Sequence, residues 1–231
     1  MHKNFECHSQ EYVQPHIKAA ELEVFKRSVS RSGMSPESFV RALTQTSLSS
    51  LAVWGQVDLE LLLLSSERFG VNPVGREIFL IRSDDRPDES PMVVLGVDGW
   101  SHVLNSHKEF AGMQFTESDQ LTEGVPTWIE CTLHRWDRRV PTSVREYFDE
   151  VRGASQPWLT HPRRMLRHKA LVQCARLAFG LVGVYDYDEA QRITTNNADT
   201  DHRTEKISPN IKQRGGLGVE AVKRQLGLRV A

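Results

Sequence analysis

The spacing of hydrophobic positions predicts two helices in the first third of the chain. Residues 35–46 and 57–69 carry apolar side chains on one helical face. Ser35 stands where an N-cap is expected, and Pro36 follows at the first helical position. Gly70 is placed to end the second helix, because glycine readily adopts the left-handed conformation found after helix ends.

The period then changes to that of strands. Residues 76–83 and 91–97 predict two strands of a hairpin, and residues 98–107 predict a short helix after it. Three further strand-like stretches follow at 110–115, 127–136 and 140–148. Within the second, the apolar residues Ile129, Cys131 and Leu133 alternate with polar ones, as in a half-buried antiparallel strand.

The last third begins with a long helix, predicted over 162–181, and a short helical continuation to residue 193. Residues 194–218 are polar and glycine-rich and predict a linker, and residues 219–228 predict a small amphipathic helix. We therefore divide the chain into an N-terminal segment (1–34), partly helical, a core (35–193), and a polar tail with a short helix (194–231). Strands in a central block with helices on both sides predict an α+β fold, with a hairpin and a three-strand block packed on the long helix.

Composition and charge narrow the class of protein. The 231 residues carry a formal net charge of −1, so a polyanion would have to bind through a local patch. The longest apolar run is too short to cross a bilayer, and the first residues do not resemble a secretory signal. Three widely spaced cysteines (Cys7, Cys131, Cys174) do not form a disulfide framework. We expect a soluble protein of a reducing cytoplasm.

The long helix carries an unusual concentration of positive charge. No Asp or Glu occurs between Arg152 and Tyr185. Lys169, Gln173 and Arg176 fall on one polar stripe, and the first two turns carry Arg163, Arg164 and Arg167. Cations in a first turn oppose the helix dipole, a conflict that a bound polyanion removes. The alternative is ion pairing with acids distant in sequence, for which the candidates are Asp98, Asp137, Asp149 and Glu150.

The order of residues in this region indicates a function more specifically than its positive charge does. The stretches "GVDGWSHVLNSHKEFAGMQF" (96–115), "PWLTHPRRMLRHKALVQCARLAFG" (157–180) and "GVYDYDEAQRI" (183–193) resemble the phage Redβ/Bet branch of the RecT family of single-strand annealing proteins. The similarity continues through 68–81 and 131–150. It covers roughly residues 36–193, with several motifs in the same order.

The resemblance implies an ATP-independent protein that binds single-stranded DNA and anneals complementary strands in homologous recombination. It implies a homo-oligomer, as a ring or helical filament, with a core akin to the eukaryotic annealing proteins, in the cytoplasm of a bacterial host. No cofactor, metal or covalent chemistry is expected. Longer members contact a phage exonuclease and the host single-strand-binding protein, and the tail here is short. The implied DNA-binding residues are Arg163, Arg164, Lys169 and Arg176, with Arg76, Arg135 and Arg138 outside the helix.

Annealing requires the phosphates to be held while the bases stay free to pair, so the positive side chains would follow the backbone. Aromatic residues could support the bases, and Trp100, Trp158 and Tyr185 are the candidates for stacking. Trp136 and Tyr187 stand where Redβ-like sequences have lysine, which predicts a less charged groove.

Two other classes of function remain open. A metal-dependent nuclease could use the same basic groove, with carboxylates such as Asp98 or Asp149 holding Mg²⁺. A phosphate- or nucleotide-binding domain could also use it. The segment 70–77 has two glycines at phosphate-loop spacing, but Arg-Glu replaces the Lys-Ser/Thr of that motif. His161, His168 and Cys174 do not have the spacing of a zinc site.

Overall fold

The structure is a computed structural model that describes residues 22–83 and 86–201. The chain divides into two units, 1–196 and 197–231, and the fold below is that of the first unit. The predicted helix at 219–228 lies outside the described residues. No helix among the described residues combines the length and apolar character needed to span a membrane.

Three helices open the described chain: α1 (Glu23–Ser32), α2 (Pro36–Gln45) and α3 (Gln56–Phe69). Ser35 caps α2 as predicted, because its Oγ accepts a hydrogen bond from the backbone N–H of Ser38 at 3.3 Å. Gly70 ends α3 with a φ of 67°. The carboxylate of Asp58 accepts from the backbone N–H of Gly55 at 2.9 Å, which fixes the start of α3.

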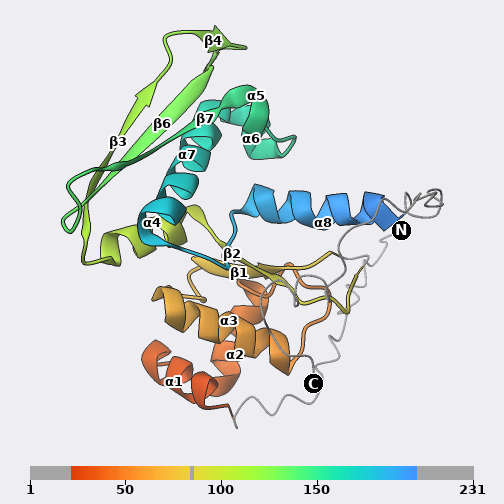
Figure 1. The fold of residues 1–231 in the computed structure, drawn as a ribbon. Coiled ribbons are helices and arrows are strands. Elements are labelled where there is room, and N and C mark those ends of the chain that lie inside the picture. The colour runs from red at the N-terminus through yellow and green to blue at the C-terminus, as the bar shows by residue number, and fades with distance from the viewer. Residues whose placement is uncertain (1–21, 84–85, 202–231) are drawn as a thin grey trace, which may run out of the picture. The chain divides into compact units, whose positions relative to one another are not determined.

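A hairpin of β1 (Ile78–Ile81) and β2 (Met92–Leu95) packs on these helices (Figure 1). Ile78 and Leu80 face the main core, while Phe79 and Ile81 face the opposite side. On that side Tyr185 forms a parallel bridge with Val94, so the segment before α8 (Tyr187–Asp201) extends the hairpin. The bridge thus joins the segment before α8 to β2, more than ninety positions earlier in the chain.

The second sheet has the order β3 (Phe110–Glu117), β6 (Trp128–Arg135), β7 (Thr142–Tyr147), all antiparallel. A small hairpin, β4 (Leu121–Thr122) and β5 (Val125–Pro126), lies between β3 and β6 in the chain. The long helix α7 (Pro162–Phe179) covers one face of this sheet (Figure 1). Ile129, Cys131 and Leu133 are buried in the core, as their alternation predicts. The α+β class and its hairpin-plus-three-strand arrangement are confirmed.

Cys131 of β6 and Cys174 of α7 are free and buried. The Sγ of Cys174 donates a hydrogen bond to the backbone oxygen of Thr142 at 3.1 Å, which joins α7 to β7. The hydrogen bond with Cys174, together with burial, raises the pKa of the Cys131 thiol. Both thiols are fully buried and pack as small core groups.

Three short helices complete the core: α4 (Val97–Ser106), α5 (Phe148–Val151) and α6 (Gln156–Thr160). The final helix is longer than its sequence predicts. Helix α8 continues to Asp201, so residues 194–201, which the sequence analysis assigns to a linker, are helical. Propensity alone did not indicate this, because the stretch is rich in Thr and Asn, which favour helices weakly.

Candidate nucleic-acid interface

A pocket of about 550 Å³ lies where four helices approach the end of β2. Its walls come from the β2–α4 turn, from α6, from the first half of α7 and from the start of α8. The lining includes Leu95, Gly96, Val97, Gln156, Pro157, Thr160, His161, Arg164, Met165, His168, Asp186, Tyr187 and Asp188. The volume falls within the roughly 300–1,000 Å³ typical of ligand sites. We call it the groove pocket.

Three helices begin at the groove pocket. The residues before α4 and α7, Gly96 and His161, line it and provide no side-chain cap. Helix α8 is capped instead by Asp186, whose Oδ1 accepts from the backbone N–H of Glu189 at 3.1 Å. Because helix N-termini carry a partial positive charge, the two uncapped ends favour an anion in this pocket.

The Lys169 side chain lies behind the pocket and does not line it. Its ammonium forms an ion pair with Asp186 and lies 3.5 Å from a carboxylate oxygen of Asp188. Asp188 also accepts hydrogen bonds from Trp158 Nε1 at 2.8 Å and from Ser155 Oγ at 3.3 Å. Lys169 thus neutralises acids that form part of the pocket wall, rather than standing free on an open stripe.

Arg176 is also satisfied internally. Its guanidinium donates to Glu189 Oε1 at 3.1 Å and to the backbone oxygen of Val184 at 2.5 Å. The predicted acid partners were Asp98, Asp137, Asp149 and Glu150, yet those used by Lys169 and Arg176 are Asp186, Asp188 and Glu189. Spacing along the sequence did not indicate these partners, because the turn at 180–186 brings the start of α8 against α7. Gln173, on the same stripe, is half-buried.

The arginines near the start of α7 are all exposed, but they differ in their surroundings. Arg163 forms an ion pair with Glu117 of β3. The Arg167 guanidinium lies 5.5 Å from the ring centroid of Phe115. Arg164 lines the groove pocket, and no ion pair holds it within the described part of the chain. Arg164 is therefore the α7 cation best placed to meet an anion in the pocket.

The three predicted cations outside α7 do not line the groove pocket. Arg76 is exposed, has a φ of 59°, and donates to the backbone oxygen of Gln45 at 3.2 Å. Arg135 forms an ion pair with Asp137 at 2.6 Å, so Asp137 pairs with an arginine as expected for that acid. Arg138 is exposed in the β6–β7 turn.

The predicted stacking residues are largely inaccessible. Trp100 is 0% exposed and Trp158 is 4% exposed, so neither ring offers a free face to a base in this structure. Trp158 packs in the hydrophobic core, and its buried Nε1–H donates a hydrogen bond to Asp188. Tyr185 is half-buried in the bridge with β2. The exposed apolar groups of the pocket are instead Val97 and Tyr187, which sequence periodicity did not single out as binding residues.

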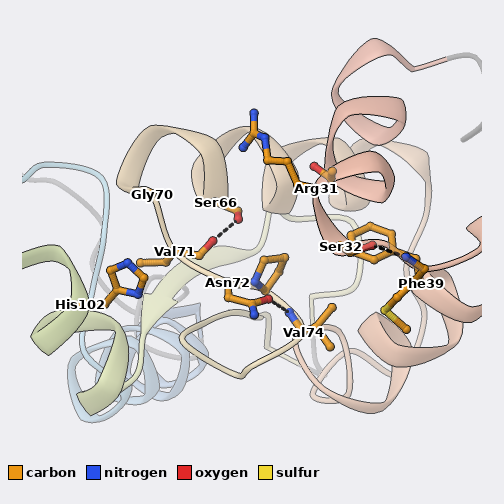
Figure 2. Close-up of a pocket in the computed structure, with 12 residues that line it drawn as sticks. Arg31, Ser32, Phe39, Ser66, Gly70, Val71, Asn72, Val74 and His102 are labelled. Carbon is orange, nitrogen blue, oxygen red and sulfur yellow. Dashed lines mark hydrogen bonds between the residues drawn. The ribbon is translucent and has the colours of Figure 1, made fainter. Parts of the chain in front are cut away.

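A second cavity, of about 410 Å³, lies between α1, the end of α3 and α4 (Figure 2). Two of its polar side chains are engaged in local hydrogen bonds to the backbone. Ser66 Oγ donates to the backbone oxygen of Val71 at 2.6 Å, and Asn72 Oδ1 accepts from the Val74 N–H at 3.0 Å. None of the predicted DNA-binding residues lines it, so we place the candidate site at the groove pocket.

The fold and pocket define a small α+β protein with a pocket at the start of a long basic helix. The chain belongs to the RecT family, whose sequence model matches residues 34–201. It is 36% identical over 187 residues to recombination protein bet of Escherichia phage lambda. That similarity covers 76% of this chain and 66% of the relative, slightly less than two thirds of the relative's length.

Proposed function

We propose that this protein binds single-stranded DNA at the groove pocket and anneals complementary strands in recombination, without ATP and as a homo-oligomer. Membership of the RecT family is the observation that carries the proposal, and it is supported by similarity to a phage recombination protein. The pocket adds a physical basis, because uncapped helix ends and Arg164 meet there beside exposed apolar groups.

The arrangement separates the places for phosphate and for base. The N-terminal ends of α4 and α7, together with the guanidinium of Arg164, form a positive wall suited to the backbone. Asp186 and Asp188 lie on the α8 side, and the single ammonium of Lys169 does not balance their two carboxylates, so a phosphate is disfavoured there. We therefore place the phosphates along α7 and the bases toward α8. Contacts made to the backbone alone bind any sequence, so Watson–Crick pairing between strands provides the specificity.

Oligomerisation follows from the size of the site. One pocket holds few nucleotides, which is too little sequence to distinguish a true complement from a chance match. Copies of the chain arranged in a ring or filament would present successive pockets to one strand. The phage exonuclease and host single-strand-binding protein implied by the resemblance are proposed partners of the assembly.

The test is an annealing reaction with two complementary labelled oligonucleotides, followed on a native gel, in EDTA and without nucleotide. Accelerated duplex formation with intact strands supports the proposal. No acceleration, or acceleration only with ATP, contradicts it. A parallel reaction with Mg²⁺ on a denaturing gel tests the nuclease alternative, for which shortened products are the signature. The described residues hold no cluster of three or more His, Cys, Asp or Glu suited to a metal.

A further inference from the structure

Tyr187 is an exposed aromatic residue in the wall of the groove pocket. It is the first residue of α8, its side chain is 47% exposed, and Asp186 caps the helix directly before it. The backbone at Tyr187 has a well-defined position, because Asp186 caps the first turn of the helix. Its location is therefore set by the fold and not by a loop.

The ring is held at two places. Its hydroxyl oxygen accepts a hydrogen bond from Gln191 Nε2 at 2.8 Å, one helical turn further along. Its ring centroid lies 6.2 Å from that of Phe79 in β1, in a tilted arrangement. These contacts leave almost half of the side-chain surface available. A platform that is already ordered loses little conformational entropy when a ligand stacks on it.

The surroundings of Tyr187 favour a flat, largely apolar group over a phosphate. Val97, which is 50% exposed, adds apolar surface to the same pocket. The carboxylates of Asp186 and Asp188 flank Tyr187 in sequence and line the pocket with it. Arg164, which has no ion pair among the described residues, comes from α7 instead. A nucleotide with its phosphate at Arg164 would thus direct its base toward α8.

We propose that Tyr187 is the platform of a nucleobase subsite, on which one base of the bound strand stacks. This rests on the proposed binding of single-stranded DNA. Where Redβ-like sequences have lysine, this chain offers an aromatic face in place of a charge. Binding at this position is then insensitive to salt, because stacking releases no counterions.

The experiment compares ordinary and abasic oligonucleotides of equal length, measured by fluorescence anisotropy with the full chain. Tyr187→Leu should weaken binding of the ordinary strand roughly 5- to 150-fold, the range for losing one stacked base. It should leave the affinity for the abasic strand and the slope of log K against log salt unchanged. Tyr187→Phe should bind like the wild type, and Tyr187→Lys should steepen the slope by about 0.7.

Tyr147→Leu is the matched control, because Tyr147 is 43% exposed on β7 and does not line the pocket. It should bind both strands as the wild type does. Equal affinity of Tyr187→Leu and wild type for the ordinary strand would overturn the inference. An equal loss on the abasic strand would do the same. If the wild type binds neither strand, the proposed function itself fails, which is a different result from both.

Discussion

Lys169 forms a buried ion pair with Asp186, seventeen positions further along the chain, and their side chains are only 8% and 4% exposed. The pair joins the middle of α7 to the residue that caps α8. Two carboxylates and one ammonium are thus removed from water together. The free-energy cost of desolvating them is compensated only while all three groups remain in contact.

Lys169→Ala should therefore destabilise the fold. Removing the ammonium leaves Asp186 and Asp188 buried without their cation, and breaking such a pair costs about 3–5 kcal/mol. The free energy of unfolding from urea titration measures this. Lys26→Ala, which removes an exposed partner of Glu23 on α1, should change it by less than about 1 kcal/mol. Equal stability of both variants would show that the buried pair contributes little.

Arg164→Gln should weaken binding of single-stranded DNA without changing stability. The side chain is exposed, lines the groove pocket and has no ion pair within the described residues. Loss of one phosphate contact should reduce the salt slope of log K by about 0.7. Filter binding at several salt concentrations measures this, with Lys26→Ala as a control for net charge. An unchanged slope would remove Arg164 from the interface.

Gly99→Ala should be destabilising for a steric reason. Gly99 lies in α4 where that helix meets the residue before β1, and an added Cβ would lie 2.0 Å from the backbone oxygen of Glu77. Relieving this overlap requires the helix to move, which costs about 1–3 kcal/mol or more. Thermal unfolding should show a lower Tm. At Gly75 an added Cβ would meet its nearest atom at 3.6 Å, so Gly75→Ala should leave Tm nearly unchanged.

His168 should make the fold less stable in mild acid. Burial is the main cause that lowers its pKa, opposed by the nearby Asp186. The unfolded chain takes up a proton near pH 6.5, whereas the folded chain resists protonation until the pH is lower. The free energy of unfolding contributed by this group therefore falls as pH drops below about 6.5, and levels off below the lowered pKa.

Urea titrations of the wild type and His168→Gln between pH 5 and 8 isolate this contribution, because the other titrating groups are common to both proteins. The difference between their unfolding free energies should shift against the wild type as the pH falls. A difference that is constant across this range would show that His168 titrates normally in the folded state.

Local patterns predicted most helices and strands, because these elements depend on residues that are close together in the sequence. The cap at Ser35, the left-handed end at Gly70 and the alternation of Ile129, Cys131 and Leu133 all appear as expected. The family resemblance likewise needed only the order of residues. Helix α8 was underestimated because its Thr- and Asn-rich second half has weak intrinsic propensity.

The placement of the cations could not be predicted in the same way. The sequence left open whether the cations of α7 lie exposed at an anion site or pair with distant acids. Arg164 is exposed and has no ion pair within the described residues. Lys169 and Arg176 instead pair with Asp186 and Glu189, at least thirteen positions away along the chain. Helical periodicity assigns a side chain to a face, but not what packs against that face.

The sequence by itself determined the fold class, most helix and strand positions and the RecT family, since each depends on local spacing or on residue order. Only the tertiary structure decided which cations meet the groove pocket, which tryptophans are buried and that Tyr187 is accessible. The physical reason is that charge neutralisation and burial depend on contacts between segments far apart in the chain, and the turn between α7 and α8 creates those contacts.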